Sequence, residues 1–257
     1  MSGQSIAIVT GANRGLGKEF VRLFVQRNEL QQIWAIARDE KKLQQLKSEF
    51  GEKIRLFSID LSERSQLDQL RTVIEHEQPQ IQYLVNNAGY AKFCSYADLS
   101  IEESINMIEV NISAVVTMGL ICVSYMNPGS HIINIASQAS FQPLPYQNIY
   151  SSTKAFVRNY TRALNVELKE KGICATAVCP GWIRTELFTR GLIGAKKATS
   201  RFPHMAAPDK VAKKTLKDAD KQKDISVYSL YTKSAHVISK LIPQRWAMKI
   251  WQWQQKL

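Results

Sequence analysis

The residues best suited to acid–base chemistry are a tyrosine and a lysine four positions apart. Tyr150 and Lys154 lie in a segment with helical periodicity, so their side chains are expected on one helix face. A free phenol titrates near about 10 and transfers protons poorly at neutral pH, but a nearby ammonium group favours the phenolate. We therefore expect Lys154 to lower the pKa of Tyr150 toward a range useful for general acid–base catalysis.

Two further polar residues could complete such a site. Ser137 follows a predicted strand, and its hydroxyl can hydrogen-bond a carbonyl oxygen. Asn111 falls within a long predicted helix, where its amide could anchor a water molecule linked to Lys154. Each residue alone has an ordinary alternative, because a Tyr–Lys pair is usually surface and a serine after a strand is usually a helix cap. The set becomes informative together with the turn described next.

A glycine-rich turn follows the first predicted strand, and a helix follows the turn. Residues 10–17 read Thr-Gly-Ala-Asn-Arg-Gly-Leu-Gly, with the glycine spacing G-x-x-x-G-x-G. Glycines allow a tight turn and let backbone amides approach a pyrophosphate, and the helix N-terminus adds the positive end of its dipole. The residues expected at the dinucleotide are Gly11, Asn13, Arg14, Gly15, Leu16 and Gly17.

The segments that must position these residues alternate between strands and helices. Short apolar, β-branched runs predict strands at 6–9, 33–37, 54–57, 81–85, 131–135, 174–178 and 225–228. Helical patterns cover 16–28, 39–50, 64–77, 101–126, 149–171 and 208–220. Near-continuous apolar strands alternating with helices indicate a parallel sheet covered on both faces. We predict a single α/β domain over residues 1–257, doubly wound, with about seven parallel strands.

Length and composition agree with one such domain. The chain has 257 residues, 45% hydrophobic and 22% charged, which excludes a disordered chain. Its four cysteines lack CxxC spacing, so we expect reduced thiols and no metal site. We recognise neither a targeting segment nor an uncharged apolar run long enough to span a membrane, and we expect a cytoplasmic protein.

The order and spacing of these motifs resemble those of the short-chain dehydrogenase/reductase family over roughly residues 5–186. The glycine-rich turn is followed by Asn-Asn-Ala-Gly at 86–89, Y-x-x-x-K at 150–154 and a segment at 180–185 similar to P-G-x-x-x-T. The resemblance implies a Rossmann-type fold and a nicotinamide dinucleotide. It implies that Tyr150 exchanges the proton, Lys154 binds the nicotinamide ribose, Ser137 orients the substrate and Asn111 joins a proton relay.

The same resemblance implies further cofactor contacts. They are Asp60, Leu61, Asn87, Ala88, Gly89, Pro180, Gly181, Ile183 and Thr185, with Tyr150 and Lys154. The family commonly pairs through the helices that carry Asn111 and Tyr150, which implies a homodimer or homotetramer.

The end of the second predicted strand bears on the choice of cofactor. An acidic residue there binds the ribose hydroxyls of NAD, whereas an arginine suits the 2′-phosphate of NADP. Position 37 is alanine, Arg38 follows it, and Arg14 is a second candidate for the phosphate. Two alternatives stay open: Asp39 could turn inward and favour NAD, or Arg38 could pair with Asp39 in solvent. We expect NADP(H) in preference to NAD(H).

The expected substrate side is mostly apolar. Residues near the reacting carbonyl are expected between Gln138 and Tyr146 and in an irregular loop, 186–207, that contains Phe188, Leu192 and Met205. We predict an NADP(H)-dependent carbonyl reductase that acts on an apolar ketone or aldehyde, or on the corresponding secondary alcohol. The alternative is a catalytically silent dinucleotide sensor or interaction protein that uses the basic tail, but the presence of Ser137, Tyr150 and Lys154 favours an enzyme.

Most of the net charge of +12 lies near the C-terminus. Residues 184–257 hold 16 Lys and Arg against 5 Asp and Glu, whereas the first 183 residues hold 18 against 17. The tail 230–257 shows helical spacing and carries three of the five tryptophans. It could lie on an anionic membrane surface, close the substrate pocket or a subunit interface, or pack on the core. We expect no nucleic-acid binding, because no such motif is present.

Overall fold

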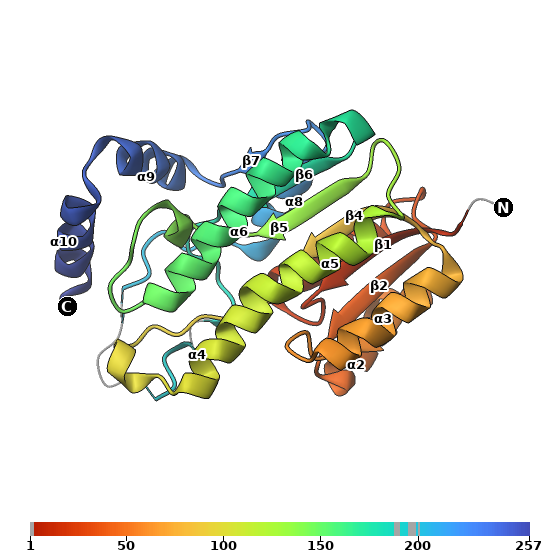
Figure 1. Cartoon of the computed structure of the whole chain (residues 1–257), viewed down its shortest axis with the longest axis horizontal. Coiled ribbons are helices and arrows are strands. Elements are labelled where there is room, and N and C mark those ends of the chain that lie inside the picture. The colour runs from red at the N-terminus through yellow and green to blue at the C-terminus, as the bar shows by residue number, and fades with distance from the viewer. Residues whose placement is uncertain (1–2, 188–190, 195–198, 200) are drawn as a thin grey trace.

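Figure 1 shows the computed structural model, which describes residues 3–187, 191–194, 199 and 201–257. A seven-stranded sheet runs through it in the order β3-β2-β1-β4-β5-β6-β7, and all of its pairings are parallel. The strands are β1 (Ser5–Thr10), β2 (Gln32–Ala37), β3 (Ile54–Ser58), β4 (Gln80–Asn86), β5 (His131–Ile135), β6 (Cys174–Val178) and β7 (Ile225–Ser226). The predicted doubly wound α/β fold is confirmed, although β7 is shorter than predicted.

Helices connect the strands and cover the sheet. They are α1 (Gly15–Val25), α2 (Glu40–Phe50), α3 (Arg64–Glu77), α4 (Ile101–Ile108), α5 (Ala114–Val123), α6 (Asn148–Glu167), α8 (Pro208–Ala219), α9 (Leu230–Leu241) and α10 (Gln244–Gln255). The single helix predicted over 101–126 is instead α4 and α5, joined by a π-helical turn at Glu109–Ser113. The predicted helix 149–171 ends earlier, at Glu167, and a 3-10 turn at Lys169–Lys171 follows.

The strands are apolar on both sides because both faces of the sheet are covered. One core cluster joins Ala7 and Val9 of β1 to side chains of α1, α2 and α8. A second cluster joins the alternating residues Ile6 and Ile8 to side chains of α3 and α5. Figure 1 shows α3, α5 and α6 in front of the sheet. Burying each of these aliphatic side chains contributes roughly 1.5–3 kcal/mol, so the two layers fix the strand ends that carry the site.

From the sequence we expect no uncharged apolar run long enough to span a membrane. The helical stretch Ile101–Val123 nevertheless could cross a membrane by length and composition alone. In the fold, however, α5 packs against α3 and β4, and α4 packs against α6, as the core helices of a sheet protein do. The apolar composition therefore reflects packing on one side and an exposed apolar surface on the other.

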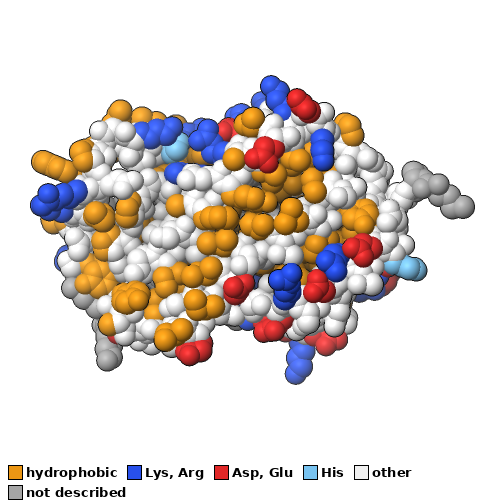
Figure 2. Space-filling view, viewed as in Figure 1, with side chains coloured by type: hydrophobic (Ala, Val, Ile, Leu, Met, Phe, Trp, Pro, Cys, Tyr) orange, Lys and Arg blue, Asp and Glu red, His pale blue; other side chains and the backbone are white. Residues whose placement is uncertain are grey.

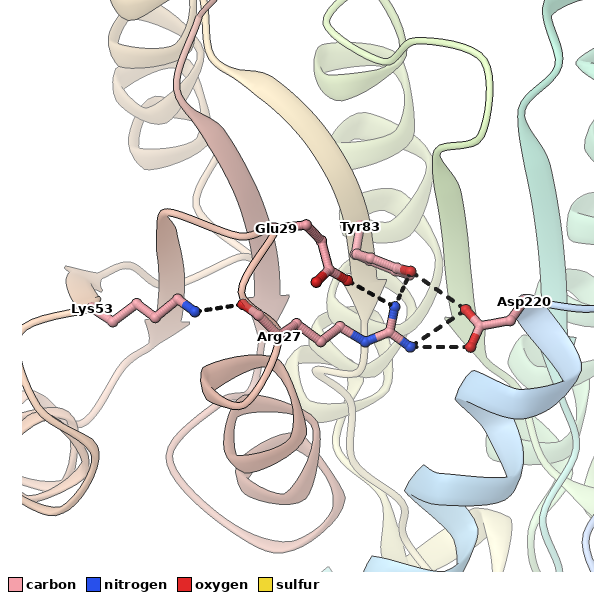
Figure 3. A network of polar contacts seen from close by, with 5 residues as sticks. All are labelled: Arg27, Glu29, Lys53, Tyr83 and Asp220. Atoms are coloured by element: carbon pink, nitrogen blue, oxygen red, sulfur yellow. Dashed lines mark hydrogen bonds and ion pairs between the residues drawn. The ribbon is translucent and has the colours of Figure 1, made fainter.

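A polar network ties together segments at the side of the sheet where α1 ends. The Arg27 guanidinium donates to the Tyr83 hydroxyl of β4 and to Asp220 just after α8, with Nη2 3.1 Å from Oδ2 (Figure 3). Lys53 Nζ donates to the Arg27 carbonyl oxygen at 2.6 Å, and Glu29 lies 3.4 Å from the guanidinium. Burial raises the pKa of Tyr83 to about 12. This tyrosine therefore stays neutral at physiological pH.

Candidate active site

The turn between β1 and α1 can accept an anion. Gly11 and Gly15 have φ of +62° and +50°, and a β-carbon on Gly11 would lie 2.9 Å from Asn87 Nδ2. A β-carbon on Gly17 would lie 2.1 Å from the Gly11 carbonyl oxygen, so this glycine lets α1 pack against the turn. No side chain in the described part of the chain caps the N-terminus of α1, and its first turn carries no acidic residue. The first amides of α1 thus fit a phosphate group.

Asn87 holds the end of β4 against this turn. Its Nδ2 donates to the carbonyl oxygens of Thr10 and Gly11 at 3.0 and 3.1 Å. The Thr10 hydroxyl oxygen in turn accepts from the backbone N–H groups of Asn87 and Ala88, each at 3.0 Å. Because β1 and β4 flank the point where the strand order reverses, this is where doubly wound sheets bind their ligands.

Ser137, Tyr150 and Lys154 meet at the same edge of the sheet. Ser137 follows β5, and Tyr150 and Lys154 lie in the first half of α6, where both are buried. The Tyr150 phenol is hydrogen-bonded to Ser137. Lys154 Nζ donates to the Ile135 carbonyl oxygen at 2.8 Å and lies 5.9 Å from the centre of the Tyr150 ring. The predicted side-chain set is therefore assembled.

The electrostatics of this set differ from the prediction. Burial raises the pKa of Tyr150, and the hydrogen bond with Ser137 offsets only part of that rise. Burial also lowers the pKa of Lys154 to about 8. The expectation that Lys154 lowers the pKa of Tyr150 is wrong in this structure, because loss of hydration outweighs the other contributions. Tyr150 thus keeps its proton at neutral pH and can donate it.

Asn111 lies behind Lys154, inside the π-helical turn. Its Nδ2 donates to the Tyr90 carbonyl oxygen at 3.0 Å and to Thr153 Oγ1 at 3.1 Å, and its Oδ1 accepts from the Tyr90 N–H at 3.1 Å. A β-carbon on Gly89 would lie 2.8 Å from Asn111 Oδ1 and 3.3 Å from Lys154 Nζ. One acceptor position of Oδ1 remains for the predicted water, and π turns often occur at functional sites.

The end of β2, where the sequence predicts the choice of cofactor, is followed by the exposed residues Arg38 and Asp39. Arg38 is 59% exposed at its side chain and pairs with Asp60, with Nη1 3.2 Å from Oδ2. Burial alone would raise the pKa of Asp60, but hydrogen bonds from Ser62 and Arg38 lower it below its usual value. Asp39 caps α2 by accepting from the Lys42 N–H at 3.1 Å. Arg38 thus pairs with Asp60 and not with Asp39, while Asp39 caps α2 and also lines the cavity.

Arg14 also lines this cavity. Its Nη1 is 3.2 Å from Glu186 Oε2, and Lys42 Nζ is 3.9 Å from the same oxygen. Three cations, Arg14, Arg38 and Lys42, therefore line this part of the cavity together with the carboxylates of Asp39, Asp60 and Glu186.

A cavity of about 1190 Å³ collects the predicted residues. Of the predicted catalytic and cofactor-binding residues, those that line it are Gly11, Asn13, Arg14, Gly15, Leu16, Arg38, Asp60, Leu61, Asn87, Ala88, Gly89, Ser137, Tyr150, Lys154, Pro180, Gly181, Ile183 and Thr185. Gly17 and Asn111 do not line it, because Gly17 packs against the turn and Asn111 is fully buried behind Lys154.

A second cavity, of about 1070 Å³, shares Ser137, Gly181 and Trp182 with the first and extends between α9 and α10. Aromatic contacts link it to Tyr150: Phe93 lies 6.2 Å from Tyr150 and 6.1 Å from Trp182 between ring centres. Trp251 of α10 stacks on Trp182 at 6.4 Å. The two cavities therefore meet at Ser137, beside Tyr150 and Lys154.

The substrate side was only partly predicted. Leu144 lines the second cavity, and Leu192 and Met205 pack in the hydrophobic cluster that contains Tyr150. Phe188 lies outside the described residues. Trp182 and Trp251 were missed as pocket residues, although Trp182 stands inside the motif at 180–185.

The tail itself forms two helices, separated at Pro243. Trp251 Nε1 donates to the Pro145 carbonyl oxygen at 3.0 Å, which anchors α10 beside the second cavity. This contact favours the alternative in which the tail closes the pocket, but Trp246 and Trp253 on the same helix are exposed.

Comparisons with known proteins identify the family of this chain. A family model described as short chain dehydrogenase matches residues 5–191. The NADP-dependent 3-hydroxy acid dehydrogenase YdfG of Escherichia coli is 34% identical over 182 residues, which cover 69% of this chain and 72% of that protein. An uncharacterized oxidoreductase of Staphylococcus epidermidis is 28% identical over 197 residues, covering 76% of this chain and 84% of that protein.

Solved dehydrogenase structures also resemble this chain. A closed form of serine dehydrogenase complexed with NADP+ is 28% identical, with a TM-score of 0.74, and the match covers 86% of this chain and 93% of that one. A short-chain dehydrogenase from Sphingobium yanoikuyae in complex with NADPH shares the fold, with a TM-score of 0.76 at 24% identity over 93% of this chain and 96% of that one. With the glycine-rich turn, the Tyr–Lys pair and the sheet order in place, the chain belongs to the short-chain dehydrogenase/reductase family of nicotinamide-dependent oxidoreductases.

Proposed function

We propose that this protein is an NADP(H)-dependent reductase of a ketone or aldehyde, with Tyr150 as the general acid. The observation that carries the proposal is the convergence of Ser137, Tyr150 and Lys154 in the cavity that the dinucleotide-binding turn also lines. A catalytically silent sensor is not favoured, because Ser137, Tyr150 and Lys154 are all present and converge.

The chemistry follows from where the protons are. When bound, the reduced nicotinamide supplies a hydride to the carbonyl carbon. Tyr150 gives its proton to the carbonyl oxygen, and the new C–H and O–H bonds complete the alcohol. Ser137 hydrogen-bonds the same oxygen and fixes its distance from the phenol, and the Lys154 ammonium favours the phenolate that remains. A proton relayed through the water expected at Asn111 then restores the phenol. The raised pKa of Tyr150 favours this direction at neutral pH, because the phenol starts protonated.

The preference for NADP(H) is supported by charge. Arg38 and Arg14 line the cavity at the end expected for the adenosine, and one oxygen of the Asp39 carboxylate, which also lines the cavity, is engaged in capping α2. Arginine suits phosphate because its guanidinium can donate two parallel hydrogen bonds. YdfG and serine dehydrogenase are also NADP proteins by name, although a fold relative from Burkholderia phymatum is in complex with NAD.

The substrate we propose is larger and more apolar than the hydroxy acids named for these relatives. Trp182, Phe202 and Trp251 line the second cavity, which opens directly beside Ser137. Aromatic walls favour apolar surface on the ligand over a carboxylate. A bulky alicyclic or long-chain carbonyl compound fits this lining.

The test is oxidation of NADPH and NADH, followed by absorbance, against a panel of carbonyl compounds. The panel contains steroid ketones, long-chain ketones and aldehydes, small aromatic ketones and 3-oxo acids. We expect turnover with NADPH on a bulky apolar member. Turnover confined to 3-oxo acids would overturn the substrate proposal, and cofactor binding without turnover on any member would favour the sensor.

We also propose that the protein pairs through α5 and α6. Figure 2 shows hydrophobic side chains gathered over these helices in the middle of one face. Leu120 of α5 and Phe156 and Val166 of α6 are exposed there. The double change Leu120→Glu and Val166→Glu is expected to yield a monomer in light scattering after gel filtration. An unchanged mass, with wild type larger than a monomer, would place the interface elsewhere.

A further inference from the structure

Helix α10 presents three different faces. Ala247, Trp251 and Gln255 are buried against the body of the protein. Trp246, Ile250 and Trp253, at positions i, i+4 and i+7, form a second face that points to solvent, where Trp246 is 66% and Trp253 80% exposed. Arg245 and Lys249 form a third, basic face beside the exposed apolar one, and Lys256 lies exposed directly after the helix. Packing on the core explains only the first of these faces.

Helix α9 repeats the same arrangement. Leu230, Val237 and Leu241, at i, i+7 and i+11, share an exposed face on which Leu230 is 82% and Leu241 77% exposed. Lys233 and Lys240, seven positions apart, lie exposed beside that face. Two consecutive helices thus leave an apolar stripe in solvent with a basic stripe next to it.

The two apolar stripes are joined. Ile238 of α9 and Ile250 and Trp253 of α10 are exposed and line the same cavity between the helices. We call the exposed apolar and basic residues of α9 and α10 the tail surface: Leu230, Lys233, Val237, Ile238, Lys240, Leu241, Arg245, Trp246, Lys249, Ile250, Trp253 and Lys256.

The charge of this surface is of one sign. Residues 225–257 contain five Lys and Arg and no Asp or Glu. In Figure 2, orange and blue side chains cover the end of the molecule formed by α9 and α10, without a red one in this view. A protein partner would need acidic residues placed opposite these cations. An anionic lipid surface offers negative headgroups beside an apolar layer.

We infer that the tail surface docks on an anionic phospholipid bilayer. The exposed tryptophans sit at headgroup depth, where an amphipathic ring is stable, and the aliphatic side chains enter the acyl boundary. The lysines and arginines stay among the phosphates, each adding an attraction that salt weakens. Trp251 and the catalytic set lie on the other side of α10 and keep their contacts.

The experiment is co-sedimentation of the full-length protein with vesicles of phosphatidylcholine, with and without phosphatidylglycerol, at low and high NaCl. Wild type is expected to sediment only with the anionic vesicles and less so at high salt. The double change Lys240→Glu and Lys249→Glu should weaken binding roughly 25-fold or more. The matched control, Lys210→Glu and Lys213→Glu on exposed positions of α8, makes the same charge change and should leave most of the binding intact.

A second pair of variants tests the apolar half. Trp246→Ser with Trp253→Ser should weaken binding, whereas Tyr96→Ser with Ile101→Ser, also highly exposed, should not. Three results would each overturn the inference. They are equal binding to both vesicle types, no binding to anionic vesicles at low salt, and equal losses of binding in test and control variants. A fall in oligomer mass caused by the tryptophan changes would also overturn it, because the tail surface would then be a subunit contact. NADPH binding by every variant checks that each is folded.

Discussion

Two buried tyrosines, each near a cation, show how differently the two ends of the sheet use the same residue types. Tyr150 lies at the carboxyl ends of the strands, with Ser137 as its hydrogen-bond partner and Lys154 turned to the Ile135 carbonyl. Tyr83 lies in β4 and is held by Arg27, which is also paired with Asp220. Burial raises the pKa of both phenols. What distinguishes them is that Tyr150 lines the cavity and meets a neutral hydroxyl, whereas Tyr83 is tied into an ion pair.

The largest contrast is expected from removing each hydroxyl. Tyr150→Phe should lower kcat by about 10²–10⁴, because the general acid is lost, while NADPH still binds. Tyr83→Phe should leave kcat unchanged and lower the free energy of unfolding by about 1 kcal/mol, the worth of a typical hydrogen bond. Steady-state kinetics of both variants measure kcat, and urea unfolding measures the free energy of unfolding. Full turnover by Tyr150→Phe would falsify its catalytic role.

The second contrast concerns the two cations and pH. Burial lowers the pKa of Lys154 from 10.5 to about 8, so the folded protein gives up this proton before the unfolded chain does. Stability should therefore rise between pH 8 and 10.5, and below pH 8 the buried ammonium carries its full cost, on the order of 3 kcal/mol. Arg27 stays charged throughout this range, since its pKa is raised.

Lys154→Met isolates this contribution. The variant should be more stable than wild type at neutral pH, and the difference should shrink as pH rises toward 10.5. Urea unfolding of both proteins across this pH range gives the difference in their free energies of unfolding. The contributions of the other titrating groups cancel in this difference. A difference that does not change with pH would mean that Lys154 is not desolvated.

Sequence alone predicted the parts of the site that depend on local geometry. The glycine turn and the Tyr150–Lys154 pair could be placed because strand ends and helix spacing fix them, and Asn87 could be placed from the family resemblance. The raised pKa of Tyr150 could not be predicted, since it depends on how much water the folded protein excludes. The same holds for Trp182 against Trp251 and Asn111 against Thr153, which are contacts between distant segments. In the tail, spacing predicted helices, but only the fold separates buried Trp251 from exposed Trp246.

The third contrast compares two arginine–carboxylate pairs. Arg38 pairs with Asp60 in the cavity and Arg27 with Asp220 at the other end, at 3.2 and 3.1 Å. Arg38→Ala should raise the KM for NADPH roughly 10–100-fold, the equivalent of a charge-assisted hydrogen bond, and leave the KM for NADH nearly unchanged. Arg27→Ala should change neither constant. Equal effects of Arg38→Ala on both cofactors would mean that this arginine does not select for the 2′-phosphate.

The smallest effect is expected from the carboxylate of the structural network. Asp220 is 45% exposed at its side chain, so water already screens its pairing with Arg27. Asp220→Asn should therefore lower the free energy of unfolding by at most about 1 kcal/mol and leave kcat and both cofactor constants as they are. The difference in the free energy of unfolding between the variant and wild type should narrow as the salt concentration rises, because screening weakens the ion pair, which only wild type has. A loss of activity with retained stability would contradict the separation between the structural Arg27 network and the catalytic end of the sheet, since it would show that the two are coupled.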